Sequence, residues 1–170
     1  MRLTMLLPLM LTTAAMPVLA ADPKPEIDRP ESTPQAVGAA HTLRSIPEAC
    51  ARIEGVFTGN AADPYKFAVV RTSPNCQPRA RFVDAAKVSP SVATGWIFND
   101  LIRAPSADCP SRKAVVKVWR RPAANATPEL DAQGSARIYL GDAKQAAQAD
   151  TLSAIPVFAA EMKVEGGGCG

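Results

Sequence analysis

Four cysteines and one histidine, His41, are the residues of this chain most able to bind a metal ion or act in nucleophilic catalysis. The gaps between successive cysteines are 26, 33 and 60 residues. Structural zinc sites usually take their ligands from close pairs such as C-x-x-C, so this spacing does not favour a metal. An even number of widely spaced cysteines predicts two disulfides, no metal and no cofactor.

The expected strands suggest how the cysteines pair. If residues 52–57 and 65–71 form a hairpin, Cys50 and Cys76 flank its two adjoining ends. A Cys50–Cys76 disulfide therefore needs no further assumption.

The second pair depends on one more assumption. Cys109 precedes the expected strand 113–121, and Cys169 follows the expected strand 157–164. If these strands are antiparallel neighbours, their outer ends meet, which predicts a Cys109–Cys169 disulfide against two other connectivities. The alternative is that Cys169, in a glycine-rich C-terminus, is a reactive thiol or forms an intermolecular bond.

Signals for catalysis are weak. A serine or cysteine nucleophile usually needs a histidine base, and His41 is the sole candidate, at the end of a proline-rich segment. We expect His41 to be an exposed linker residue. No G-x-S-x-G motif and no phosphate-binding loop is present in the sequence.

Asp100 is the acidic residue that most needs an explanation, because it lies among apolar residues in WIFNDLI. Strand alternation places it on the same face as Trp96 and Phe98. A buried carboxylate needs a partner, and a strand-end arginine such as Arg103 or Arg71 is the expected one. Paired carboxylates also perform glycoside hydrolysis, but no recognisable spacing supports that chemistry here.

The best positive signal is a basic face formed by the expected strands 79–84, 113–121 and 136–140. Alternation directs these side chains outward: Arg79, Arg81, Lys113, Lys117, Trp119, Arg121, Arg137 and Tyr139. If the outward faces adjoin, they form a cationic surface with two aromatic rings, of the kind that binds proteins or anionic glycans and lipids. The alternative is a solvated sheet face whose basic residues protect edges.

Short segments rich in β-branched and aromatic residues, bounded by proline and glycine, predict strands. These segments are 52–57, 65–71, 79–84, 95–103, 113–121, 136–140 and 157–164. Two further segments, 46–52 and 142–154, have helix-start signals. We expect a mainly β fold, a small antiparallel sandwich or curved sheet of about seven strands with one or two short helices and two disulfides.

The N-terminal residues differ in character from the rest. Residues 1–20 have a basic start, an apolar middle and small residues before Ala20, which is typical of a secretory signal peptide. Residues 21–40 are rich in proline and charge, which predicts a flexible arm. Residues 41–170 are expected to form one domain, with no stretch long enough to span a membrane.

Charge and compartment narrow the function. Without residues 1–20 the chain has 18 basic and 16 acidic residues, a net charge of +2. That charge does not favour nucleic acid. We expect a bacterial protein, periplasmic or extracellular, that acts as a non-catalytic interaction module binding an envelope protein or an anionic surface polymer through the basic face. The alternatives are an envelope hydrolase using carboxylates and a passive structural component of the envelope.

Overall fold

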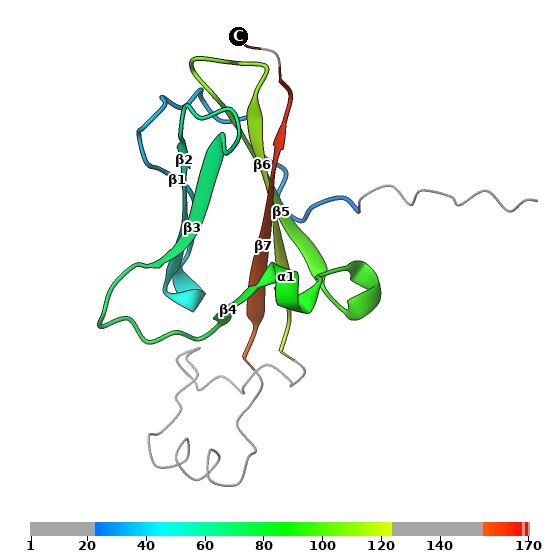
Figure 1. Ribbon diagram of the computed structural model, residues 1–170. Coiled ribbons are helices and arrows are strands. Elements are labelled where there is room, and N and C mark those ends of the chain that lie inside the picture. The colour runs from blue at the N-terminus through cyan, green and yellow to red at the C-terminus, as the bar shows by residue number, and fades with distance from the viewer. Residues whose placement is uncertain (1–22, 124–154, 168, 170) are drawn as a thin grey trace, which may run out of the picture.

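The computed structural model describes residues 23–123, 155–167 and 169. Within these ranges seven strands form two sheets that face each other (Figure 1), one of strand order β1-β2-β3 and one of order β4-β7-β6-β5. The predicted fold class is therefore confirmed: a mainly β protein with two sheets, one short helix and two disulfides.

The three-stranded sheet is an antiparallel meander of β1 (His41–Ile46), β2 (Ala51–Phe57) and β3 (Tyr65–Arg71). The expected hairpin of the second and third strands is confirmed. The expected helix over 46–52 is wrong, because only a single 3-10 turn, η1 (Pro47–Ala49), separates β1 from β2. Cys50 ends this turn in the left-handed region at φ 50°, and its backbone N–H closes the turn on the Pro47 carbonyl.

The four-stranded sheet consists of β5 (Ile97–Pro105), β6 (Lys113–Arg121), β7 (Val157–Glu165) and β4 (Arg81–Asp84). Its first three strands are antiparallel, but β4 pairs with β7 in parallel, which the antiparallel expectation missed. The helix α1 (Ala85–Val88) and the 3-10 turn η2 (Val92–Thr94) follow β4. The strand expected at 136–140 and the helix expected at 142–154 lie outside the described residues.

The main core lies between the two sheets, and its side chains come from both. The predicted inward-facing residues of β6, Ala114, Val116 and Val118, are buried there. A second, smaller cluster lies on the other face of the four-stranded sheet and includes Trp96 and Trp119, with α1 packed against it. Among the described residues, no helix has the length and apolarity needed to cross a bilayer.

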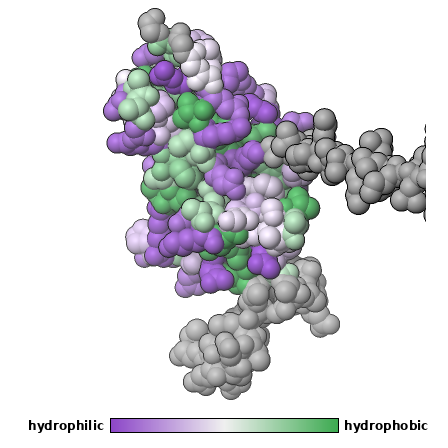
Figure 2. Space-filling model, turned by 45° about the vertical axis from the view of Figure 1, so that its right-hand side comes forward, coloured by the Kyte–Doolittle hydropathy of each residue, from purple (hydrophilic) through white to green (hydrophobic). Residues whose placement is uncertain are grey.

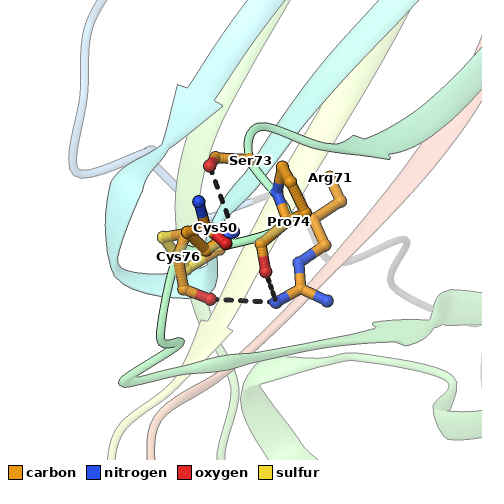
Figure 3. The surroundings of a disulfide bond; sticks show 6 residues. Cys50, Arg71, Ser73, Pro74 and Cys76 are labelled. Atoms are coloured by element: carbon orange, nitrogen blue, oxygen red, sulfur yellow. Dashed lines mark hydrogen bonds between the residues drawn. A yellow bond between two sulfur atoms is a disulfide. The ribbon is translucent and has the colours of Figure 1, made fainter.

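Both disulfides have the expected pairing. Cys50–Cys76 ties the start of β2 to the loop after β3, with a Cα–Cα distance of 5.8 Å (Figure 3). Cys109–Cys169 ties the β5–β6 connection to the C-terminal end, with a Cα–Cα distance of 5.6 Å. The described part of the chain has no free cysteine.

The proline-rich segment is paired with β5, in contrast to the expected flexible arm. The backbone N–H of Ile27 donates to the Asn99 carbonyl at 2.9 Å, and that of Gln35 donates to the Pro105 carbonyl at 2.8 Å. Parallel β-bridges join Ile27 to Asp100 of β5 and Gln35 to Ser106, the residue that follows β5. The segment therefore covers an edge that a four-stranded sheet would otherwise leave unpaired. We call residues 26–38 the arm.

Candidate functional site

Of the eight predicted surface residues, the structure describes six, and these do not form one open cationic and aromatic surface. Lys113 and Lys117 share the outer face of the four-stranded sheet, where Lys113 forms an ion pair with Glu31 at 2.5 Å. Lys117 lies beside Glu161 in the register of β6 and β7. Figure 2, which brings the right-hand side of Figure 1 forward, shows hydrophilic and hydrophobic side chains interspersed. Both predicted lysines of this face therefore have an acidic neighbour.

Trp119 is a clear correction to the predicted face. It does point to the outer side of the sheet, but it is only 6% exposed, because it packs against Phe98 with the ring centroids 5.0 Å apart. The segment after β4, which carries α1, covers this part of the sheet. A partner therefore cannot use the Trp119 ring without moving that cover.

The remaining described residues of the predicted face are all exposed. Arg81 of β4 and Arg121 of β6 lie in one row across the sheet, because both pair in register with Val157, and Arg79 lies just before β4. Arg137 and Tyr139 fall outside the described residues.

Asp100 is buried as expected, but on the other side of its sheet. A β-bulge between Phe98 and Asp100 shifts the register with β6, so Asp100 pairs with Val118 and faces the space between the sheets. Asp100 is 0% exposed. Simple strand alternation predicted the face of Trp96 for Asp100, because it does not allow for the extra residue that a bulge inserts.

The partners of Asp100 are also different from those expected, Arg103 and Arg71. Arg29 of the arm donates from Nε to both carboxylate oxygens at 2.9 Å, and Arg44 of β1 places Nη1 3.1 Å from Oδ2. This cluster joins the arm, β1 and β5. A carboxylate without exposed surface and with two guanidinium partners has a structural role, so Asp100 does not support the hydrolase alternative.

A second charged contact fixes the arm nearer its start. Glu26 accepts hydrogen bonds from Arg120 at 2.5 and 2.6 Å and from Asn99 at 2.7 Å. The Arg120 guanidinium, helped by Asn99, lowers the pKa of Glu26 to about 2 against a partial opposing effect of burial. Glu26 therefore stays ionised, and its contact with Arg120 persists, across the neutral pH range.

His41 is not the exposed linker residue we expected. It is the first residue of β1, half-buried, with Nε2 2.8 Å from the Tyr65 hydroxyl and its ring stacked on Phe57. Burial lowers its pKa. Gly55 makes room for this group, since a Cβ at that position would lie 1.7 Å from the Tyr65 hydroxyl oxygen. His41 thus belongs to a packed end of the core.

At the opposite edge of the sandwich, between β3 and β4, no described segment pairs with either strand in the way the arm pairs with β5. Two hollows of about 570 and 390 Å³ lie there and share three lining residues, Val69, Phe82 and Val83. We call these two adjoining hollows together the groove. Phe67 lines one end of it, and Val69 remains 37% exposed. Both sheets thus contribute apolar side chains to a surface in contact with solvent.

The two ends of the groove differ in charge. Arg71 and Arg81 line the end beside the Cys50–Cys76 disulfide, and no acidic residue lines that end. Asp84 lines the other end. The side chain of Arg81 has no hydrogen-bond or ion-pair partner among the described residues. The disulfide end therefore presents a cationic rim, and Arg81 is the one predicted basic residue that lines the groove.

Sequence reasoning missed the groove. Apolar residues occur on consecutive positions of YKFAVVR and RARFVD, which is the available signal that these strands have more than one apolar contact surface. No pattern within one strand shows that two edge strands of different sheets face each other.

Together the fold and the groove define a disulfide-stapled β-sandwich with one covered edge and one open edge. No family model, no curated protein and no solved structure matches the chain.

Proposed function

We propose that the protein is an exported, non-catalytic interaction module that binds another protein of the cell envelope through the groove between β3 and β4. The observation that carries this proposal is the groove itself, an exposed apolar depression with a cationic rim on a sandwich whose other edge is covered. The groove also runs along the edge strand β3, and unpaired strand edges invite association with other chains.

Export is supported by two independent features. The first is the signal-like character of residues 1–20. The second is that all four cysteines are paired in disulfides, bonds that form and persist in oxidising compartments such as the periplasm. Amino-terminal sequencing of the purified mature protein tests this part, and we expect it to start at Ala21.

The groove favours a protein partner over an anionic polymer. Its lining is mainly aliphatic and aromatic, with Phe67, Val69 and Phe82 as the large side chains. A glycan or a row of headgroups needs many polar donors and exposed ring faces, whereas Trp119 is buried and Lys113 is already paired. Apolar side chains of a protein are the chemistry that such a lining stabilises.

Site-specific photo-crosslinking in cells tests this function. A photoreactive residue at position 69 lies in the groove, whereas one at position 68 is exposed on the opposite face of the same strand. We expect a crosslinked protein from position 69 and none from position 68, and binding of that protein after purification of both components. Equal crosslinking at the two positions, or none at 69, contradicts the proposal.

A further inference from the structure

We propose that the partner contributes an extended segment that adds to the free edge of β3 as an extra strand, with an acidic residue at the disulfide end of the groove. This inference rests on the proposed function and specifies the chemistry of the partner. It follows from three observations, on the backbone, the side chains and the charge of this edge.

The backbone of β3 has donors and acceptors available for a further strand. Thr72 donates to the Cys50 carbonyl at 2.9 Å, and Thr58 donates to the Pro64 carbonyl at 3.1 Å. In the antiparallel register of β2 and β3, these bonds require that residues 66, 68 and 70 also bond to β2. Phe67 and Val69 then direct their N–H and C=O groups away from β2, and no described strand pairs with that side.

The side chains of the same residues supply the specificity. Phe67 and Val69 lie on the face of β3 that carries the buried Tyr65, so they face the second sheet. Phe82 of β4 packs against the same core and lines the groove. A strand added beside β3 presents every second side chain to this surface, because successive side chains of a strand point to opposite faces. The segment therefore has apolar residues at alternate positions, as in other cases of strand addition.

The charge of the groove fixes which end of the segment is acidic. Arg71 donates to the carbonyl oxygens of Pro74 and Cys76 at 3.1 and 3.0 Å (Figure 3), which holds its guanidinium beside the disulfide. Arg81 lines the same end. A carboxylate there gains two cationic neighbours, whereas at the other end it meets Asp84.

A second copy of this chain fits the groove less well than a different protein. Pairing of β3 with its own copy brings Lys66 and Arg71 to the edge, and β3 contains no acidic residue to face a cationic rim. Like charges that face each other across an interface disfavour association. The occupant we infer is therefore an acidic, extended segment of another protein.

Synthetic peptides on the purified full-length protein provide the test. The probes are labelled heptapeptides, matched to the seven residues of β3, in which valine and threonine alternate and glutamate occupies the first or the last position. Two control peptides carry lysine in place of glutamate. We expect one glutamate peptide to bind, and its lysine counterpart to bind about tenfold more weakly or less. Failure of both glutamate peptides to bind overturns the inference.

N-methylated versions of the binding peptide separate strand addition from simple burial of apolar groups. Methyl groups on the backbone nitrogens that face β3 should abolish binding, and those on the intervening nitrogens should leave it within about twofold. If both methylated sets bind like the parent, strand addition is wrong while groove binding stands. The proposed function itself fails separately, in the crosslinking comparison of positions 69 and 68.

A charge exchange provides the last arm of the test. Arg81→Glu should weaken the glutamate peptide and strengthen the lysine peptide, and Lys87→Glu, an exposed position on α1 outside the lining of the groove, is the matched control. Thermal melting of each variant confirms that it folds. Unchanged preference of Arg81→Glu for glutamate overturns the assigned polarity. A stable dimer that the peptides do not dissociate overturns the inferred occupant.

Discussion

The two edges of the sandwich are built on different principles. At one edge the arm pairs with β5 and brings charged side chains to Asp100 and Arg120. At the other edge no further strand of the described residues pairs with β3 or β4, and apolar residues reach solvent. The first edge is joined by ion pairs and backbone hydrogen bonds, whereas beside the second a disulfide ties the start of β2 to the loop after β3.

This difference indicates which edge is available to a partner. Proteins protect sheet edges because unpaired strand edges invite association with other chains. Here the protection is applied to β5, through a segment that contacts it over most of its length, and not to β3. We therefore interpret the open edge as a binding site, and the covered edge as a feature that stabilises the fold.

The largest effect that we expect comes from removing the buried charge of the covered edge. Asp100→Ala leaves Arg44, whose side chain is 13% exposed, without its anionic partner and next to a second guanidinium, Arg29. Breaking a buried pair in this way costs about 3–5 kcal/mol of unfolding free energy. Urea denaturation measures the change.

A matched control for this prediction is Asp108→Ala, at an exposed position in the connection between β5 and β6. We expect the control to change the unfolding free energy by no more than about 0.5 kcal/mol. A loss of less than about 1 kcal/mol in Asp100→Ala would show that the cluster does not hold the covered edge.

The disulfide of the open edge is the next largest contribution. The double variant Cys50→Ala/Cys76→Ala opens a loop with a sequence separation of 26 residues, which lowers the unfolding free energy by about 2–4 kcal/mol. Urea denaturation of the oxidised parent and the oxidised double variant measures the difference, which should disappear under a reductant, because the reductant breaks Cys109–Cys169 in both proteins. The prediction is wrong if the double variant is as stable as the oxidised parent.

Local patterns predicted much of the fold. Alternation of apolar residues identified β2, β3 and β6, and the hairpin then placed Cys50 beside Cys76. These features depend on residues close together in the sequence, because the alternation of apolar and polar residues within one strand already shows which side faces the core. The same reasoning correctly assigned the inward-facing side of β6.

The features that sequence reasoning missed depend on distant contacts. The partners of Asp100, Arg29 and Arg44, lie 71 and 56 residues away, and one extra residue in the β5 bulge reversed the predicted face. The proline and charged residues of the arm indicated disorder, because the sequence of that segment does not show that the carbonyl groups of β5 accept its hydrogen bonds. The groove could not be inferred either, because it requires the packing of two sheets.

The arm contact at Glu26 should make the covered edge sensitive to acid. The folded-state pKa of Glu26 is about 2, lowered first by its hydrogen bond to Arg120, from an ordinary value of 4.5. The contact therefore stabilises the fold fully above about pH 4.5, and this contribution is lost as the pH falls through about 2. Since the Glu26 side chain is 36% exposed, solvent screens the pair and we expect about 1 kcal/mol or less.

The acid sensitivity is measured by comparing the parent protein with Glu26→Gln in urea at about pH 7 and about pH 3. The difference between the two proteins should be larger at the higher pH and shrink at the lower one. Other carboxylates titrate in both proteins and cancel in this comparison. A difference that grows on acidification contradicts the pairing.

The smallest effect on stability, and the one that most sharpens the comparison, is expected at Val69. Its side chain is 37% exposed in the groove, so Val69→Asp should change the unfolding free energy by about 0.5 kcal/mol or less. The same variant places a carboxylate on the apolar lining and should abolish binding of the partner, because burying that charge without a partner is unfavourable. Ala68→Asp, on the opposite face of β3, is the matched control and should retain binding. If Val69→Asp instead unfolds the protein as strongly as Asp100→Ala, then the open edge is part of the core, and the distinction between an edge for stability and an edge for binding is lost.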